Sequence, residues 1–339
     1  MSLYYIRYLC INYFGMDSRI DIFVALGERL RRFGKDEQSK RVLAEAIAGN
    51  EWFTAEDILR AIDAICEEFL DREKLTKWVA QYSIPVSVRR VAIIMAGNIP
   101  LVGFFDMMCA VICGYETYIK PSSKDTVLTK YVIDTLRDIS DDVHIFDYDS
   151  KAEYDMIIAT GGAEAARYFR TRYASTPALI RGSRHSVAVL AGDESEQELR
   201  GLQDDIFMYN GLGCRNVSLI FLPRGKQLEL RVPKMNPMYR GNYLHCKAMR
   251  SMMGQSFVDF GECIAVEERD FSSNISQINY CYYDDLVEVE SWLAENDEEL
   301  QCVVSRALSH PRAVAFGRAQ YPTLMDYADG VDVMKFLTE

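Results

Sequence analysis

Apolar residues recur at helical spacing through the first eighty residues of the chain. Ile58, Ile62 and Ile65 follow one another near the period of an α-helix. Thr54 stands three residues before Asp57, which is the spacing of a capping box with aspartate in place of the usual glutamate. This pattern predicts a helical N-terminal layer.

Beyond that layer, short apolar runs alternate with stretches of helical length. The pattern predicts strands at 90–95, 116–119, 143–146, 156–159 and 186–190, and helices at 101–113, 126–137, 163–172 and 194–209. Further strands at 217–222, 263–267 and 278–282, with a helix at 286–294, indicate a second unit of the same kind. Such alternation is typical of parallel sheets covered by helices, so we expect an α/β protein.

Composition excludes several classes of function. The 339 residues include 49% hydrophobic residues, enough for packed cores, and the net charge of −12 would repel a phosphate backbone, so nucleic acid is not an expected partner. Nine scattered cysteines and the absence of a signal-like N-terminus indicate a cytoplasmic protein with free thiols. Residues 1–14 are too short and too polar to span a membrane. They fit either a packed strand or an overextended start before Met16.

No metal site is expected. Cys109 and Cys113 can share one helical face, but no second Cys or His pair accompanies them, and the four histidines are isolated. Core packing is the simpler interpretation of these two cysteines.

One octet carries the strongest chemical signal. Residues 211–218 read Gly-Leu-Gly-Cys-Arg-Asn-Val-Ser, which places Cys214 after a glycine pair and before an apolar run. Glycines leave room for a reacting carbonyl to approach a nucleophilic thiol, and the N–H of Cys214 would face the developing oxyanion. The same residues also fit a small buried cysteine that closes a turn.

Weaker signals lie in three other turns. Thr160-Gly161-Gly162 follows a predicted strand and opens a helix, where the backbone can approach a pyrophosphate, although the full G-x-G-x-x-G fingerprint is absent. Lys120-Pro121-Ser122-Ser123 ends another strand and suits an adenosine ribose or a phosphate. Asn98 lies in a third turn. Each of these segments also fits a plain connection.

Together these segments resemble a known family. The ordered markers are Gly97-Asn98-Ile99-Pro100-Leu101, residues 119–125, Ile180-Arg181-Gly182-Ser183-Arg184, the octet, and the tail at 321–332. They resemble the fatty acyl-CoA reductase of bacterial bioluminescence, the LuxC-type family, over about residues 18–337. This family is a branch of the aldehyde dehydrogenase superfamily.

The resemblance implies a fold and its division. We expect an aldehyde dehydrogenase-like fold with a Rossmann-type parallel-sheet cofactor domain behind the N-terminal helices, within residues 1–209. An α/β catalytic domain would follow at 210–320. Residues 321–339 would form a C-terminal segment, in which 327–337 is either a strand that crosses to a partner in a homodimer or higher oligomer, or the end of the second domain.

The resemblance also implies roles for individual residues. Cys214 matches the nucleophile, and Asn98 matches the asparagine whose side-chain amide stabilises the oxyanion. Lys120 matches the lysine at the adenosine ribose, with Ser122 and Ser123 beside it. The turn Thr160-Gly161-Gly162 matches the segment near the pyrophosphate.

Three departures from the superfamily pattern carry information. Ser123, followed by Lys124, stands where NAD-preferring relatives place an acid, which favours NADPH and leaves NADH possible. Ile180-Arg181-Gly182 stands where oxidising members carry a glutamate base, so a thioacyl enzyme would survive to be reduced. Ala166 replaces the glycine that closes the pyrophosphate turn in the family.

We therefore predict an acyl-CoA reductase that reduces a fatty acyl-CoA or another acyl thioester to the aldehyde through a thioacyl enzyme. Three alternatives remain open. An oxidative aldehyde dehydrogenase would need a replacement base, for which Glu262 is the candidate. A thiol hydrolase would need His185 or His245 beside Cys214. The chain could also be a weakly active scaffold in an acyl-transfer complex.

Overall fold

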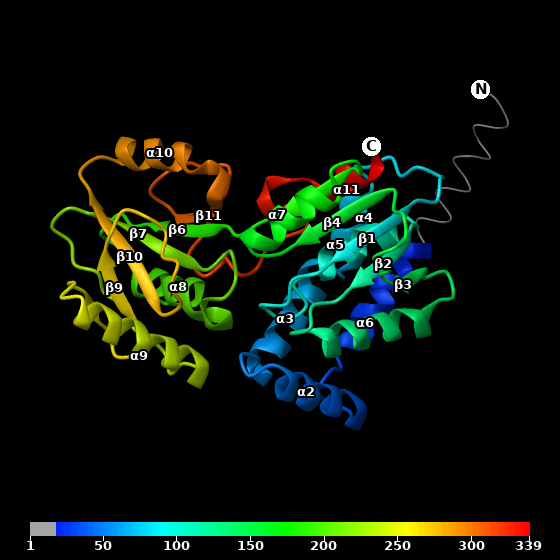
Figure 1. Ribbon diagram of the computed structural model, residues 1–339, viewed down its shortest axis with the longest axis horizontal. Coiled ribbons are helices and arrows are strands. Elements are labelled where there is room, and N and C mark those ends of the chain that lie inside the picture. Colours follow the sequence, from blue (N-terminus) through cyan, green and yellow to red (C-terminus); the bar gives the residue numbers. More distant parts are fainter. Residues whose placement is uncertain (1–17) are drawn as a thin grey trace. The chain divides into compact units, whose positions relative to one another are not determined.

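The computed structural model describes residues 18–339, which form two compact units (Figure 1). The first unit runs to Gly182 and also includes Thr323–Glu339, and the second unit spans Ser183–Pro322. Residues 1–14, whose sequence fits either a packed strand or an overextended start, lie outside the described residues.

The first unit is built on an open sheet of five parallel strands. These are β1 (Arg90–Ile94), β2 (Glu116–Lys120), β3 (Ile145–Asp147), β4 (Met156–Thr160) and β5 (Ala178–Arg181), in the order β3-β2-β1-β4-β5. The chain moves outward from β1 to β3 and then returns to the other side of β1 with β4. This is the strand order of a Rossmann-type sheet, with its topological switch point between β1 and β4.

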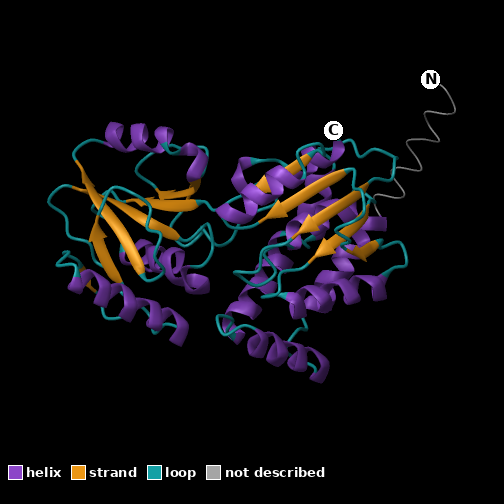
Figure 2. Ribbon diagram, in the orientation of Figure 1, coloured by secondary structure: helices purple, strands orange, loops and turns teal. Residues whose placement is uncertain are grey.

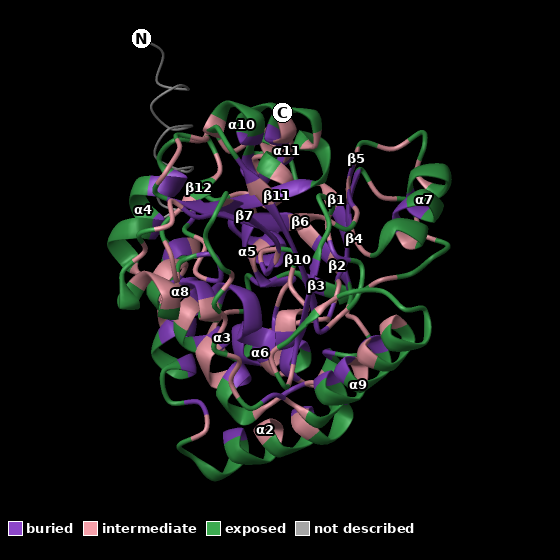
Figure 3. Cartoon of the chain, turned by 90° about the vertical axis from the view of Figure 1, so that its left-hand side faces the viewer, coloured by how far each residue is buried: buried purple, intermediate pink, exposed green. Residues whose placement is uncertain are grey.

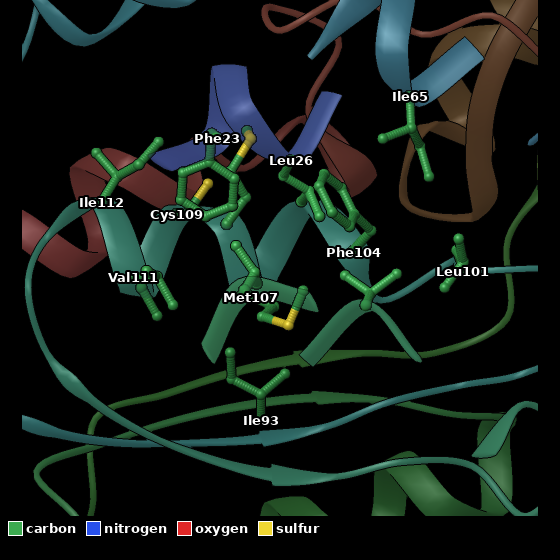
Figure 4. Close-up of a cluster of buried hydrophobic side chains, with 14 of the residues drawn as sticks. Phe23, Leu26, Ile65, Ile93, Leu101, Phe104, Met107, Cys109, Val111 and Ile112 are labelled. Carbon is green, nitrogen blue, oxygen red and sulfur yellow. The ribbon is translucent and has the colours of Figure 1, made fainter. Parts of the chain in front are cut away.

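Helices cover both faces of this sheet. The connections are α5 (Phe104–Ile112), α6 (Thr126–Ile139) and α7 (Ala163–Arg172). Helices α5 and α6 pack over Ile93 and Ile158 on one face, and Phe169 of α7 packs over Ala92 on the other. Helix α5 is apolar almost all round because a further layer covers it: Phe23 and Leu26, in the helix over residues 18–30, pack on its outer side (Figure 4).

The N-terminal layer is helical, as predicted. It comprises helical residues 18–30, α2 (Glu37–Gly49), α3 (Ala55–Glu68) and α4 (Arg72–Val79). Thr54 is the N-cap of α3, and its hydroxyl oxygen accepts from the Asp57 N–H at 3.1 Å. Cys109 and Cys113 lie in the adjoining core, where burial raises the pKa of Cys109 well above its ordinary value and that of Cys113 to about 12. Both are structural cysteines.

The second unit contains a seven-stranded mixed sheet (Figure 2). Its strands are β6 (His185–Val189), β7 (Val217–Pro223), β8 (Val258–Asp259), β9 (Ile264–Glu267), β10 (Gln277–Tyr283), β11 (Leu300–Ser305) and β12 (Ala313–Val314), in the order β12-β11-β6-β7-β10-β9-β8. Only β8 is antiparallel to its neighbour within the described residues 18–339.

Helices pack on this sheet as well. They are α8 (Glu196–Phe207), α9 (Pro237–Met252) and α10 (Leu286–Glu295). Val289 and Leu293 of α10 pack over Leu219 and Phe221 of β7, and Tyr243 of α9 packs over the β9 end of the sheet. Figure 3 shows the strands largely buried, with the exposed residues on the outer sides of the helices.

The division of the chain differs from the predicted one. The boundary after residue 209 falls inside the second unit, because β6 pairs with β7 and β11 and therefore belongs to the second sheet. The observed boundary lies after Gly182, between β5 and β6.

The C-terminal segment also differs from both forms considered for it. It ends in a helix, α11 (Val333–Thr338), rather than in a strand. Val333, Met334 and Leu337 are fully buried in the core of the first unit, and the Tyr115 hydroxyl donates to the Leu337 carbonyl at 2.8 Å. A helix forms because these apolar residues share one helical face behind an N-cap, Asp332. The prediction of a crossing strand was therefore wrong for this segment, as was its assignment to the second domain.

Candidate active site

The residues predicted in the first unit lie at one edge of its sheet. Asn98 follows β1, Lys120 ends β2 with Ser122 and Ser123 beyond it, and Thr160-Gly161-Gly162 ends β4. Because the strands are parallel, their carboxyl ends lie at the same edge. The edge includes the switch point between β1 and β4, where open α/β sheets bind their ligands.

The Asn98 turn and the Lys120 turn support each other. A Cβ on Gly97 would lie 2.5 Å from the Cβ of Ser122, so only glycine fits beside this serine. Beyond Ser122, a carboxylate oxygen of Asp125 accepts from the Leu101 N–H at 2.7 Å. Leu101 is in the left-handed region, with φ 55°, which the buried Asp125 helps to hold. The turn that contains Asn98 is thus fixed at both ends.

The turn after β4 suits a phosphate-bearing ligand. A Cβ on Gly161 would lie 2.9 Å from that of Ala165, so this position also requires glycine. Gly162 is the N-cap of α7, has open space around it and has no side chain with which to cap the helix. A helix start of this kind binds anions, although Glu164 in the first turn works against it. Ala166, at the place of the family's closing glycine, is buried inside α7.

At this edge the described residues fit a dinucleotide. Lys120 and Ser123 are exposed, Ser122 is half-buried, and the glycine turn follows β4, which lies on the other side of β1 from β2, at the switch point. A cation, hydroxyl groups and a glycine-lined helix start are the groups that hold ribose and pyrophosphate.

Arg181, which the resemblance places where oxidising relatives carry a glutamate base, is a buried and paired cation. Arg181 is the last residue of β5, and its side chain is 6% exposed. Its Nη1 lies 2.6 Å from a carboxylate oxygen of Asp106 in α5. A guanidinium stays protonated at neutral pH and cannot accept a proton from water. Arg181 is therefore not a general base.

Cys214 lies in the second unit, in a tight turn just before β7. The Asn216 N–H donates to the Gly213 carbonyl at 3.1 Å, which leaves Cys214 and Arg215 as the central residues of the turn. Cys214 is exposed, whereas the seven other cysteines of residues 18–339 are buried. Its exposure excludes the alternative of a buried cysteine that closes a turn.

The chain reaches this turn through unusual backbone. After α8 ends at Phe207, Tyr209, Asn210 and Gly211 have φ values of 53°, 56° and 67°. Two successive residues other than glycine in the left-handed region are costly, and persist where the surroundings determine them strongly. Here the side chain of Asn216 forms hydrogen bonds on both sides of these residues and so helps to hold their backbone.

Asn216 makes four hydrogen bonds through its side-chain amide. Its Nδ2, which carries two hydrogens, donates to the carbonyls of Asp205, Ile206 and Met208, at 3.2, 3.1 and 3.0 Å, so at least one hydrogen is shared between two of them. Its Oδ1 accepts from the Gly213 N–H at 2.8 Å. One buried side chain thus joins the end of α8 to the turn of Cys214. Asn216 belongs to the octet, but its place in the sequence predicts no role for it.

Ser186 holds the other side of the turn. Its hydroxyl donates to the Cys214 carbonyl at 2.9 Å, and its oxygen accepts from the Cys302 N–H at 3.2 Å. Burial raises the pKa of Cys302 to about 11, while the charge of Arg215 acts in the opposite direction. The charge of Arg215 therefore acts on the buried Cys302 thiol.

The residues named for the rival functions lie elsewhere in the second unit. His185 stacks on Phe271 with ring centroids 4.7 Å apart, and burial lowers its pKa. Strand alternation turns it to the opposite face of the sheet from Ser186, which contacts Cys214. His245 is exposed on α9, and Glu262 forms an ion pair with Arg240 at 2.9 Å. These contacts favour neither a Cys–His pair nor a free carboxylate base.

Residues 18–339 contain no group of three or more His, Cys, Asp or Glu side chains placed to hold a metal ion. Over the same range, no helix combines the length and the apolar character that crossing a membrane requires.

Comparison with known proteins identifies the family. The family model for acyl-CoA reductase (LuxC) matches residues 35–232, which is more than half of the chain. The protein belongs to the acyl-CoA reductase (LuxC) family. The match includes the three strand-end turns and Cys214, and it confirms both the predicted resemblance and an oxidoreductase of this family. No curated protein sequence matches the chain significantly.

Solved structures show the fold. Aldehyde dehydrogenase 21 from Physcomitrella patens, solved with the reaction product succinate, is 11% identical with a TM-score of 0.62, over 87% of this chain and 73% of that one. The NAD⁺ complex of an aldehyde dehydrogenase from Bacillus cereus is 15% identical with a TM-score of 0.61, over 86% and 72%. An oxidoreductase from Marinobacter aquaeolei is 14% identical with a TM-score of 0.64, over 91% and 79%. The LuxC-family chain thus has the predicted aldehyde dehydrogenase-like fold.

Proposed function

We propose that this LuxC-family protein reduces an acyl thioester, with a fatty acyl-CoA as the expected substrate, to the aldehyde with NADPH. The observation that carries the proposal is the exposed thiol of Cys214, held in a turn that hydrogen bonds fix on both sides. An accessible sulfur in a rigid turn suits nucleophilic attack on a thioester.

In the proposed reaction, the Cys214 thiolate attacks the thioester carbonyl carbon. A carbon–sulfur bond to Cys214 forms, the bond to the leaving thiol breaks, and coenzyme A departs. An ordinary cysteine, with a pKa of about 8.5, is only a few per cent ionised at neutral pH. Arg215, the next residue in the turn, is the cation adjacent in sequence to this thiol.

The side-chain amide of Asn98 and the backbone N–H of Cys214 would stabilise the oxyanion. The Asn98 turn is fixed by Gly97 on one side and by the Asp125–Leu101 hydrogen bond on the other, which supports a donor role. Preorganised donors of this kind stabilise the charge that develops on the thioester oxygen.

The cofactor would bind at the carboxyl edge of the first sheet. Lys120, Ser122 and Ser123 would hold the adenosine ribose and its 2′-phosphate, and Thr160, Gly161 and Gly162 would face the pyrophosphate. Ser123 is exposed and Lys124 follows it, so the edge presents hydroxyl groups and a cation where an acid would repel the extra phosphate. When bound, NADPH supplies the hydride that reduces the acyl carbon.

The replacement of the base favours reduction over hydrolysis. Arg181, paired with Asp106, cannot activate water at the position where oxidising relatives carry glutamate. The thioacyl group on Cys214 then persists until it is reduced. The resulting thiohemiacetal on Cys214 collapses to the aldehyde, and the sulfur leaves as the thiolate.

The test is direct. Purified protein is incubated with NADPH or NADH and a panel of acyl-CoA and acyl carrier protein thioesters, and cofactor absorbance and products are followed. Aldehyde formation with NADPH supports the proposal. Formation of acid from aldehyde would favour an oxidative enzyme. Hydrolysis of the thioester without cofactor would favour a hydrolase. Absence of NADPH binding would favour a scaffold.

A further inference from the structure

We infer that Asn216 is a positioning residue that holds the Cys214 turn in its reactive shape. This inference rests on the proposed role of Cys214 as the nucleophile. It concerns how the chain orients the thiol, and it adds no step to the reaction.

The first support is the number of groups that one side chain satisfies. A helix leaves its last carbonyls without partners inside the helix, and here Asn216 Nδ2 bonds to two of them, those of Asp205 and Ile206, and to the carbonyl of Met208 just after the helix. Backbone groups of this kind are costly when buried without a partner. Asn216 is only 5% exposed, so water is a poor substitute for it.

The second support is the bond in the other direction. Asn216 Oδ1 accepts from the Gly213 N–H, while the Asn216 N–H donates to the Gly213 carbonyl. These two bonds close a ring around Cys214 and Arg215. A Cβ on Gly213 would lie 3.0 Å from the same Oδ1, a tight contact, so glycine suits the close approach.

The third support is the strained backbone between the two anchored segments. Tyr209, Asn210 and Gly211 occupy left-handed conformations between the carbonyls and the N–H that Asn216 binds. The amide anchors the chain on both sides of this strained stretch, so we expect its loss to leave the stretch less constrained and to let the turn move. A shift of about 1 Å at a reacting group can cost on the order of 100-fold in rate.

Asn216→Asp isolates this role. Aspartate has the same shape and keeps an acceptor for the Gly213 N–H, but it replaces the donating amide with an oxygen that faces three carbonyls. The matched control is Asn279→Asp in β10 of the same unit. Asn279 is also buried, accepts from Gln277 Nε2 at 2.8 Å and donates to the Asp270 carbonyl at 2.9 Å.

The first measurement is the rate of iodoacetamide alkylation at Cys214, mapped by peptide mass, at a temperature where circular dichroism shows both variants to be folded. We expect Asn216→Asp to slow alkylation and thioester turnover by ~10- to 100-fold, with the KM for NADPH unchanged. Asn279→Asp should lose stability and keep both rates. Normal alkylation in Asn216→Asp, or an equal loss in Asn279→Asp, would overturn the inference.

Alkylation separates this inference from the proposed function, because it needs no acyl thioester. If the unaltered protein reduces no thioester but Asn216→Asp still slows alkylation, the proposed function fails and the positioning role stands. If Asn216→Asp does not fold, hydrogen exchange in the unaltered protein decides: the Gly213 N–H should be protected as strongly as the N–H groups of β7. Rapid exchange at Gly213 would contradict the inference.

Discussion

The carboxyl edge of the first sheet and the Cys214 turn of the second unit are built in different ways. At the edge, polar residues follow the ends of regular parallel strands, and glycines at 97 and 161 admit close neighbours. At the turn, left-handed backbone is held by buried side chains, chiefly those of Asn216 and Ser186. The edge therefore depends on the fold of its sheet, and the turn on individual hydrogen bonds.

This difference bears on how each region tolerates substitution. At the edge, several exposed groups would share the binding of a ligand, so the loss of one should weaken binding gradually. In the turn, each polar group has specific partners, and removal of one leaves others buried without partners. We expect substitutions near Cys214 to have the larger effects on catalysis.

The largest expected effect is that of Cys214→Ser. Serine is a far weaker nucleophile here, so turnover should fall by at least ~10³-fold, and intact mass should show no acyl adduct after incubation with acyl-CoA. Cys246→Ser is the matched control, since Cys246 is a buried free thiol in the same unit. An acyl group mapped to any other residue would reassign the nucleophile.

Asn98→Ala should have the next largest effect. Loss of one oxyanion donor costs ~10²–10³-fold in turnover, while the KM for the cofactor should change little. Circular dichroism should show that the variant still folds, because Asp125 and Gly97 hold the ends of the turn. Near-normal turnover in this variant would remove Asn98 from the mechanism.

The sequence predicted the edge more completely than the turn. Helix and strand periods located β1, β2, β4 and α7 to within a few residues, and strand ends in a parallel sheet share an edge whatever their side chains. The octet located Cys214 but gave no role to Asn216 or Ser186, because their partners are backbone groups fixed by tertiary structure. Strand β11 was missed, since its short run follows an acidic stretch.

The division of the chain was predicted less well for the same reason. Strand β6 was located correctly, but its partners, β7 and β11, lie later in the sequence, so its own pattern gives no sign that it belongs to the second sheet. The C-terminal helix α11 likewise packs against a unit formed more than a hundred residues earlier. Local periodicity predicts elements, and long-range pairing decides their unit.

A smaller effect at the edge is expected from Ser123→Glu. A carboxylate beside the ribose would repel a 2′-phosphate and accept from ribose hydroxyls, so kcat/KM for NADPH should fall by ~10-fold and that for NADH should hold or rise. Ser251→Glu, on the exposed end of α9, makes the same change in net charge as a control. An equal loss with both cofactors would show that Ser123 does not lie at the 2′ position.

The smallest effects concern two buried carboxylates, one in each region. Burial raises the pKa of Asp125 and that of Asp205 to about 7. Between the ordinary aspartate pKa of about 4 and pH 7, the folded protein holds these protons and the unfolded chain does not. Folding therefore takes up protons, and each group makes the free energy of unfolding fall by up to ~1.4 kcal/mol per pH unit as the pH rises through this window.

Substitution of each carboxylate by asparagine should change the stability of the protein in opposite directions. In Asp125 one oxygen accepts from Leu101 and the other has no hydrogen-bond partner among residues 18–339, so Asp125→Asn keeps its bond and should stabilise the protein above pH 7. In Asp205 both carboxylate oxygens accept, one from the Gly317 N–H and the other from the Ala319 N–H. Asp205→Asn therefore places an amide N–H against one of these two backbone N–H groups and should destabilise the protein. Urea unfolding at several pH values between about 4 and 8 measures both. If the two variants changed the free energy of unfolding alike, the edge and the turn would not differ in their dependence on single hydrogen bonds.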